Sequence, residues 1–407
     1  MDPLGIYPKL QDFPIRGKRV FVRVDFNVPL AVNAENAWEV KDATRLIAAC
    51  ETIRYIQKQG ARCLLASHLG RPKGKPELKY SLEPVGLKLS EILGVDVVLT
   101  PDFSGDGLRG LVQRMSSDEL LLLENLRFHP GEEANAPDFA MKLAQLCDIF
   151  INDAFGTMHR AHASTAALPG LVKAKAIGFL VQRELEYLTP LRDNPKRPFV
   201  LLMGGAKVSD KLNLIERLLP KVEAILIGGA MAYAFLKAKG NTIGNSLCDD
   251  AQVELAGRLL ETARSRSVSV ELPCDHVVTR SLDSKMVGEA TLDENIPDGM
   301  IGVDIGPKTI RRFEAQLARA QTIFWNGPMG IFEREAFAKG TYELARLVAS
   351  VTGKKLAGGG DVAAAIAGSG VQDGFDFIST GGGATLEFLE GKVLPGLKAL
   401  EFLRHPG

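Results

Sequence analysis

Four glycine clusters in the second half of the chain follow short apolar runs and precede amphipathic segments. The runs are Val200–Met203, Ile225–Ile227, Leu356–Ala357 and Phe377–Thr380, and the clusters are Gly204-Gly205, Gly228-Gly229, Gly358-Gly359-Gly360 and Gly381-Gly382-Gly383. Glycine at a turn from a strand into a helix lets a ligand approach the bare backbone. The start of the helix then directs free N–H groups and the positive end of its dipole at that ligand. Four such junctions predict a surface that binds a polyphosphate.

This surface differs from the phosphate loop found in many nucleotide-binding proteins, because no G-x-x-x-x-G-K-[ST] segment occurs in the chain. Lys207, Lys211 and Asp361 stand at or beside the glycine clusters. The sequence therefore predicts a nucleotide site of another design.

Basic and polar residues follow the apolar runs of the first half. Residues 18–26, 63–66, 120–123 and 149–151 read as strands, and the segments that follow them are Asp25–Pro29, Ser67–Pro72, Glu124–His129 and Asn152–Arg160. The planar fork of arginine binds phosphate or carboxylate at two points. A single arginine is more often part of a surface salt bridge. The shared placement of His68, Arg71, Arg127 and Arg160 after strands, with Arg45 early in a helix, favours a small anionic substrate.

The elements that must position these residues alternate between strand and helix along the whole chain. Such alternation predicts α/β domains built on doubly wound parallel sheets, and ligands of these sheets bind at the carboxyl ends of the strands. The length of 407 residues predicts two domains. A helix over 181–191 is the expected connector, with turn signals at Thr189-Pro190 and at Asp193-Asn194-Pro195.

Composition excludes several other classes of protein. Lys and Arg together number 49, as do Asp and Glu, and this zero net charge argues against a sequence-independent nucleic-acid binder. The five cysteines are scattered and form no C-x-x-C pair, which favours reduced thiols in the cytoplasm. The apolar run over 224–236 is too short to span a membrane, and no signal-peptide pattern stands at the N-terminus.

The segments that carry the chemistry resemble those of the phosphoglycerate kinase family. They are Arg23–Pro29, Ser67–Pro72, Leu123–Phe128, Asn152–Gly156, Gly204–Lys211, Trp325–Pro328, Gly358–Asp361, Ser379–Gly383 and Glu390–Pro395, and they occur in the family's order. The resemblance implies two Rossmann-like domains that face a central cleft. Residues 1–180 would bind 3-phosphoglycerate or 1,3-bisphosphoglycerate, 181–192 would form the interdomain helix, and 193–394 would bind ADP or ATP with Mg²⁺. The tail, 395–407, would pack back on the N-terminal domain, and the enzyme would be a monomer.

The resemblance also implies a role for individual residues. Arg45 and Lys207 would stabilise the group in transfer. The substrate would contact Asp25, Phe26, Asn27, Arg45, His68, Leu69, Gly70, Arg71, Arg127 and Arg160. The nucleotide would contact Gly204, Gly205, Lys207, Lys211, Gly228, Gly302, Asn326, Glu333, Gly359, Gly360, Asp361 and Val362. Asp361 would bind the metal, and Gly381 and Gly382 would face the transferring phosphate. The arginines and His68 are expected to neutralise substrate oxygens.

Two features of the sequence need separate comment. Val362 stands where the family has Thr or Ser, so a hydroxyl that could bond a phosphate is missing and altered nucleotide affinity is expected. His159 and His162 are three residues apart, but Arg160 between them would repel a cation and no third ligand is evident. They are interpreted as loop histidines rather than as a zinc site.

Two alternative functions remain open on the sequence. A nicotinamide-dependent dehydrogenase would carry G-x-G-x-x-G after a strand, and none stands at these junctions. A non-catalytic relative that only binds nucleotide is disfavoured because the expected cationic residues are all present.

Overall fold

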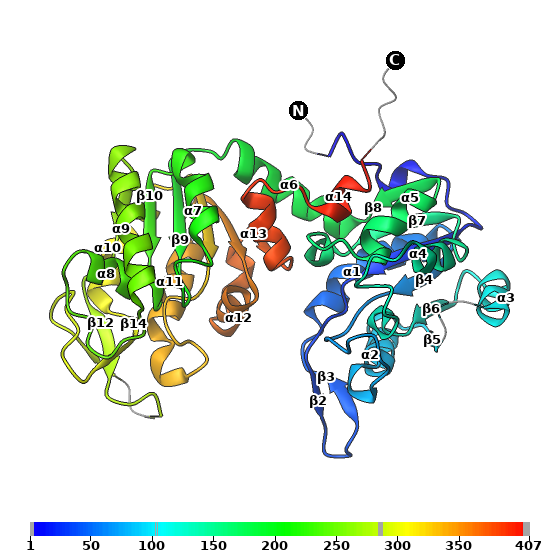
Figure 1. The fold of residues 1–407 in the computed structure, drawn as a ribbon, viewed down its shortest axis with the longest axis horizontal. Coiled ribbons are helices and arrows are strands. Elements are labelled where there is room, and N and C mark those ends of the chain that lie inside the picture. The colour runs from blue at the N-terminus through cyan, green and yellow to red at the C-terminus, as the bar shows by residue number, and fades with distance from the viewer. Residues whose placement is uncertain (1–3, 102, 104, 284–287, 402–407) are drawn as a thin grey trace. The chain divides into compact units, whose positions relative to one another are not determined.

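The computed structural model of the chain describes residues 4–101, 103, 105–283 and 288–401, and these form two compact units (Figure 1). The first unit comprises the described residues of Met1–Glu186 and Val393–Gly407, and the second comprises those of Tyr187–Lys392. Each unit contains one six-stranded sheet in which every neighbouring pair of strands is parallel. The prediction of two α/β parallel-sheet domains is confirmed.

The first sheet has the strand order β5-β6-β4-β1-β7-β8. Its strands are β1 (Arg19–Val24), β4 (Arg62–Ala66), β5 (Val97–Thr100), β6 (Leu120–Leu123), β7 (Ile149–Asp153) and β8 (Ala174–Ile177). In the register of the central strands, Arg23 lies opposite both Ala66 and Asn152. The segments after β1, β4 and β7 therefore begin at the same level, on one edge of the sheet.

Helices and short elements surround this sheet. The helices are α1 (Thr44–Lys58), α2 (Glu83–Leu93), α3 (Asp106–Arg114), α4 (Pro137–Ala144) and α5 (Leu168–Leu171); a hairpin of β2 (Leu30–Val32) and β3 (Trp38–Val40) stands apart from the sheet. Val20 and Val22 belong to a core that includes Leu46 and Ile53 of α1. On the other face Phe21 stacks on Phe150. Both faces of β1 are therefore buried, as in other parallel sheets.

The helix α6 (Phe179–Asp193) crosses the division between the units. The expected helix over 181–191 is present, but the turn expected at Thr189-Pro190 is wrong, since Pro190 lies inside the helix. Proline in a helix removes one backbone donor. Buried Leu188 and Leu191 lie on either side of Pro190, and their packing holds the last turn in place despite the lost hydrogen bond.

The second sheet has the order β11-β10-β9-β15-β16-β17. Its strands are β9 (Phe199–Met203), β10 (Ala224–Ile227), β11 (Ser269–Glu271), β15 (Thr322–Asn326), β16 (Lys354–Gly358) and β17 (Phe377–Ser379). Met203 lies opposite Ile227 and Asn326, and Gly358 lies opposite Ser379. All four glycine clusters therefore lie at the carboxyl edge of one sheet, with Asn326–Pro328 between the two pairs.

A second, antiparallel sheet in this unit was not predicted. It has the order β13-β12-β14, with β12 (His276–Thr279), β13 (Glu289–Ala290) and β14 (Ile301–Ile305). The helices of the unit are α7 (Leu212–Leu218), α8 (Met231–Ala238), α9 (Asp250–Ser265), α10 (Pro307–Leu317), α11 (Lys339–Ser350), α12 (Gly360–Gly368) and α13 (Gly383–Leu389). Its core joins Leu202 and Trp325 of the parallel sheet to Ile305 of β14 and Leu344 of α11.

The chain returns to the first unit at its end. The helix α14 (Pro395–Lys398) begins there, and Gly396 N donates a hydrogen bond to the Met158 carbonyl oxygen at 2.9 Å. Residues 402–407 of the expected tail lie outside the described residues. All five cysteines are free. Among the described residues, no helix combines the length and apolarity needed to cross a membrane.

Candidate active site

A cluster of basic side chains lies at the carboxyl edge of the first sheet, around His68. This histidine follows β4 and is buried. Burial first, and then the positive charges of Arg23, Arg127, Arg160 and Arg45, lower the pKa of His68 well below its usual value. The adjacent strands β6, β4, β1 and β7 deliver most of this cluster, because their parallel register brings their following segments to one edge.

Hydrogen bonds join the loops of this cluster to one another. Arg45 Nη1 lies 2.9 Å from Asp25 Oδ2 and donates also to the Asn27 carbonyl oxygen at 3.1 Å. Gly70 N donates to Asn27 Oδ1 at 2.9 Å, and Arg127 Nη1 donates to the Gly70 carbonyl oxygen at 2.6 Å. Three loops after three different strands are thus tied together around Gly70.

His68 is neutral near pH 7 in these surroundings, because its pKa is lowered well below the ordinary value by burial and by the nearby arginines. Its Nδ1 lies 3.3 Å from Arg23 Nη2. A neutral ring in that contact accepts through Nδ1 and carries its proton on Nε2. His68 can therefore offer a ligand an N–H donor at Nε2, and not the positive charge expected from the sequence.

Arg23 is a member of the cluster that sequence reasoning missed. It is fully buried, and its Nε donates to Ser164 Oγ at 2.8 Å. Ser164 in turn donates to buried Glu132 at 2.5 Å, which supplies a negative charge near the guanidinium. The signal that could have found Arg23 is the alternation in β1: Arg23 stands among valines and phenylalanine on a strand whose two faces are both buried.

The remaining predicted substrate residues differ in what they can offer. The side chains of Phe26 and Leu69 are buried in the core, which leaves only their backbone for a ligand. Arg71 is exposed, and Arg160 Nε donates to His159 Nε2 at 3.1 Å. His162 also lies near the cluster, since burial and then Arg127, Arg23 and Arg160 lower its pKa to about 4.

A pocket of about 370 Å³ opens at the carboxyl edge of the parallel sheet in the second unit. Four of the predicted nucleotide residues line it: Gly205, Gly302, Glu333 and Asp361. They come from segments after β9, in β14, after β15 and at the start of α12. The fold therefore brings together residues that are more than 150 positions apart in the chain.

The apolar lining of this pocket was not predicted. It includes Tyr233, Leu247, Leu282 and Ile331. The Tyr233 hydroxyl lies so close to Gly302 that a Cβ there would be 2.3 Å from it, so a larger residue would have to displace the buried Tyr233 side chain. Apolar walls with a few polar groups suit the flat base of a nucleoside.

The glycines of the four junctions fall into two classes. A Cβ on Gly204 would lie 2.1 Å from the Pro328 carbonyl oxygen, and one on Gly228 would lie 2.3 Å from Met329 Sδ. These glycines allow close packing between loops rather than the approach of a ligand. A Cβ on Gly205, Gly360 or Gly382 would meet nothing within 4 Å, so these positions leave the backbone open.

The other predicted nucleotide residues lie around the pocket without lining it. Lys207 is exposed and lines a neighbouring pocket, while Asn326 is buried and its side-chain amide donates to the Gly358 carbonyl oxygen. Burial lowers the pKa of Lys211, against the opposing effect of Asp210 and Asp361. Gly381 N donates to Ser379 Oγ at 3.2 Å, and a Cβ on Gly359 would lie 2.9 Å from Asn326 Nδ2.

Asp361 is the one predicted metal ligand. It is exposed in the first turn of α12, lines the pocket, and forms no hydrogen bond or ion pair with the residues that the structure describes. Within the same described ranges, no group of three or more His, Cys, Asp or Glu side chains gathers for a metal. A single free carboxylate fits Mg²⁺ that arrives with a nucleotide, since Mg²⁺ keeps several waters and takes phosphate oxygens.

Asp304 gives the second unit a pH-dependent stability. It is buried in β14, and its carboxylate accepts from Gly340 N at 2.5 Å and from Ile305 N at 2.9 Å. Burial nevertheless raises its pKa to about 7 from the usual 3.8. The folded state therefore binds this proton more tightly than the unfolded state, so the stability it contributes is present below about pH 4 and is lost as the pH rises to about 7.

We expect the unfolding free energy of the wild type, relative to that of Asp304→Asn, to decrease steadily between pH 4 and pH 7 and to stay constant above pH 7. Urea unfolding at a series of pH values measures this difference. Parallel curves for the two proteins across this range would contradict the assignment.

Comparison with known proteins extends over nearly the whole chain. A family model described as "Phosphoglycerate kinase" matches residues 10–392. A phosphoglycerate kinase of Anaeromyxobacter sp. (strain Fw109-5) is 51% identical over 389 residues, which cover 95% of this chain and 97% of that protein. One of Borrelia hermsii is 49% identical over 392 residues, or 96% of this chain and 98% of that protein.

Solved structures agree with the sequence relatives. The structure of phosphoglycerate kinase from Coxiella burnetii superposes with a TM-score of 0.85 at 39% identity, covering 97% of this chain and 98% of that one. The phosphoglycerate kinase of Pyrococcus horikoshii OT3 gives a TM-score of 0.80 at 31% identity, with the same coverage. The matching sequence segments, the two parallel-sheet units and these relatives together lead to one conclusion: the chain belongs to the phosphoglycerate kinase family.

Proposed function

We propose that the chain is a phosphotransferase of glycolysis and gluconeogenesis that moves a phosphoryl group reversibly between 1,3-bisphosphoglycerate and ADP, giving 3-phosphoglycerate and ATP. The observation that carries the proposal is the pairing of two unlike sites in one chain of this family. One unit gathers arginines around His68, and the other forms a pocket with apolar walls and open glycine backbone at its rim.

The first unit binds the phosphoglycerate in this proposal. Arg127, Arg160 and Arg71 bind its phosphate and carboxylate oxygens through their planar forks. His68 donates a hydrogen bond, and Asp25 with Asn27 bind the substrate hydroxyl. The existing contacts of Asn27 and Arg127 with Gly70 hold these groups in place before the substrate arrives, which reduces the entropy lost on binding.

The second unit binds the nucleotide. The base lies against Tyr233 and Leu282, Glu333 binds the ribose hydroxyls, and the phosphates lie along Gly205 and Gly360 with Lys211 nearby. Asp361 binds the Mg²⁺ that accompanies the nucleotide, and this ion neutralises part of the phosphate charge. Gly229 and Pro328 also line this pocket.

Phosphoryl transfer requires no general base here. A β-phosphate oxygen of ADP attacks the phosphorus of the acyl phosphate, the bond from that phosphorus to the acyl oxygen breaks, and the carboxylate of 3-phosphoglycerate leaves. The attacking oxygen is already ionised, and the leaving oxygen departs as a carboxylate, which needs no proton. Arg45, Lys207 and the backbone N–H groups of Gly381 and Gly382 stabilise the charge on the moving group, which is the main contribution a protein makes to this chemistry.

Because the two sets of residues belong to different units, we propose that the units close on one another when both substrates are bound. Small-angle X-ray scattering should then report a smaller radius of gyration with 3-phosphoglycerate and Mg-ATP together than with either alone. An unchanged radius would contradict closure.

Val362 provides a test of the nucleotide site. Its side chain is buried in the first turn of α12, and Cγ1 lies 3.8 Å from where a Cβ on Gly359 would be. Threonine at this position would place a hydroxyl beside the glycine turn that faces the phosphates. We expect Val362→Thr to tighten ADP and ATP binding roughly fivefold, equivalent to one hydrogen bond of ~1 kcal/mol. Isothermal titration calorimetry measures the affinities, and unchanged values would exclude this role.

The decisive experiment for the whole proposal is an assay that couples ATP formation from 1,3-bisphosphoglycerate and ADP to a second enzyme. Turnover that depends on Mg²⁺ supports the proposal. Nucleotide binding without turnover would instead identify a non-catalytic relative.

The free state of all five cysteines is consistent with a cytoplasmic enzyme. Because one chain carries both sets of residues, a monomer suffices for activity.

A further inference from the structure

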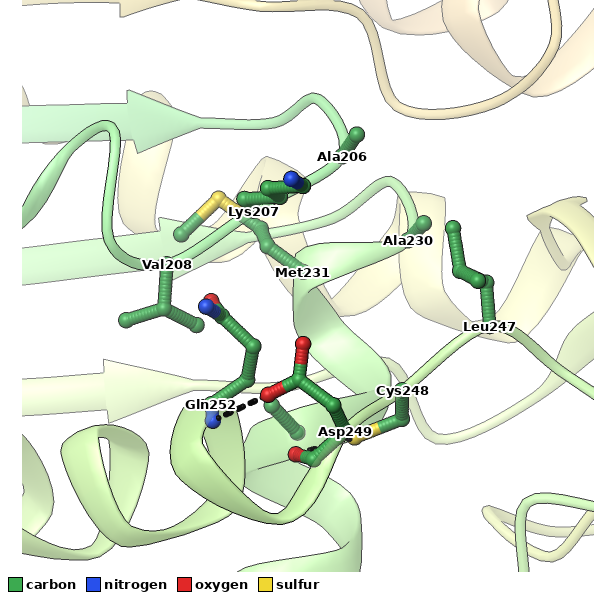
Figure 2. Close-up of a pocket in the computed structure, with 10 residues that line it drawn as sticks. Ala206, Lys207, Val208, Ala230, Met231, Leu247, Cys248, Asp249 and Gln252 are labelled. Carbon is green, nitrogen blue, oxygen red and sulfur yellow. Dashed lines mark hydrogen bonds between the residues drawn. The ribbon is translucent and has the colours of Figure 1, made fainter.

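A second pocket, of about 250 Å³, lies beside the nucleotide pocket in the same unit. It separates the segment Ala206–Val208 from the first turn of α9, and it shares Ala206, Ala230 and Leu247 with the nucleotide pocket (Figure 2). Gln252 of α9 reaches across it, so that its amide lies next to Val208. This side chain connects an outlying helix to the loop that carries Lys207 and Lys211.

The connection consists of two hydrogen bonds to one residue of that loop. Ser209 N donates to Gln252 Oε1 at 3.1 Å, and Gln252 Nε2 donates to Ser209 Oγ at 3.3 Å. A glutamine amide has one acceptor and one donor end, so it can match the backbone N–H and the hydroxyl of a single serine at the same time. The two contacts together fix both the position and the orientation of Ser209.

Gln252 is itself held at the start of its helix. Asp249 caps α9, and its Oδ1 accepts from Gln252 N at 2.8 Å (Figure 2). Such a cap stabilises the first turn of a helix. The side chain that contacts Ser209 therefore starts from a fixed backbone, in a helix whose buried residues Ala256 and Leu259 pack against the body of the unit.

Few other hydrogen bonds hold the loop 206–211 in place. Ala206, Lys207, Ser209 and Asp210 are exposed, and only Val208 is buried. Within the described parts of the chain, no side chain from outside the segment 206–211 other than that of Gln252 forms a hydrogen bond with it. An exposed loop with one buried anchor samples many backbone conformations, and each residue that is fixed costs conformational entropy.

We infer that Gln252 is a positioning residue for phosphoryl transfer: by holding Ser209 it limits the positions that Lys207, two residues away, can take beside the nucleotide pocket. This inference rests on the function proposed above. Lys207 touches the reacting atoms, whereas Gln252 acts only through the loop. Loss of the two hydrogen bonds between Gln252 and Ser209 keeps the charge of Lys207 but lets its ammonium group occupy more positions. Misplacement of a catalytic group by about 1 Å can cost up to 10²-fold in rate.

The first test is the Gln252→Ala variant of the full chain in the coupled ATP-forming assay. We expect kcat to fall roughly tenfold, since the loop is loosened rather than removed. The KM for 1,3-bisphosphoglycerate should not change, because that substrate binds in the other unit. Glu261→Ala is the matched control, as this exposed residue lies on the same helix away from Ser209. Gln252→Glu should restore part of kcat, because its carboxylate still accepts from Ser209 N, whereas the Ser209 hydroxyl already donates to Asp210 Oδ1 at 3.3 Å.

The second test asks whether Gln252 acts through Lys207. In a Lys207→Ala background, the further change Gln252→Ala should lower kcat by less than twofold, since no lysine remains to be positioned. The inference is overturned if Gln252→Ala retains the wild-type kcat, or if its loss is as large without Lys207 as with it. An inactive wild type would overturn the proposed function and this inference together, whereas an active wild type with an unaffected Gln252→Ala variant overturns the inference alone.

Discussion

Arg45→Ala is expected to lower kcat by roughly 10²- to 10³-fold, the usual effect of removing one group that stabilises charge in the transition state. In the structure Arg45 is one-third exposed and forms an ion pair with Asp25 at 2.9 Å. The Asp25 carboxylate of this pair is only 11% exposed, so it needs another partner when Arg45 moves away. In the proposed mechanism the substrate hydroxyl is that partner, and Arg45 moves to the transferring group.

The binding of ADP and ATP should be unaffected by Arg45→Ala, because the nucleotide pocket belongs to the other unit. Arg54→Ala is the matched control: Arg54 lies on the same helix and, among the described residues, donates only to the Ile92 carbonyl oxygen. Steady-state kinetics gives kcat, and calorimetry gives the nucleotide affinities. An Arg45→Ala enzyme that turns over at the rate of the Arg54→Ala control would remove Arg45 from the chemistry.

Gly204→Ala is expected to lower the free energy of unfolding by about 3 kcal/mol, as for severe overpacking. The added Cβ would lie 2.1 Å from the Pro328 carbonyl oxygen and 2.6 Å from that of Gly327. Both are backbone atoms, and Gly205 N donates to the same Pro328 oxygen at 2.9 Å. Neither loop can retreat without breaking that hydrogen bond, so the strain cannot be relieved by a side-chain rotation.

Gly360→Ala is the contrasting change. Its Cβ would meet nothing within 4 Å and the residue has no left-handed φ, so the fold should keep its stability. If nucleotide phosphates approach the bare backbone at this turn, the methyl group should instead weaken ADP binding roughly tenfold, the effect of ~1.4 kcal/mol. Urea unfolding and calorimetry on both variants separate the two roles. Equal losses of stability in both would contradict the division of the glycines into two classes.

The sequence predicts which strands carry both sites, because buried parallel strands read as continuous apolar runs. Leu120–Leu123 is apolar throughout and buried throughout, and the residues after it follow at the edge where ligands of such sheets bind. Once the strands are parallel and in register, the glycine clusters after β9, β10, β16 and β17 must share one edge. Pattern and register therefore place these residues without any knowledge of side-chain contacts.

Other features depend on contacts that no local pattern contains. The lowered pKa of His68 follows from its burial and from arginines more than 20 residues away in the chain, and the burial of Arg23 depends on Ser164 and Glu132. The turn signal at Pro190 was overridden by packing of the leucines around it. Gly204 and Gly228 look like Gly205 in the sequence, and only their neighbours in space separate packing from ligand approach.

The return of the chain to the first unit at α14 has a consequence for synthesis on the ribosome. The six strands of the first sheet all precede Gly178, yet Gly396, whose N–H bonds the Met158 carbonyl, is made only after the whole second unit. At ~5–20 residues per second, the roughly 200 intervening residues take about ten to forty seconds. During that interval the nascent first unit lacks the segment that packs on Met158 and Thr165, so it completes its native structure last although it was translated first.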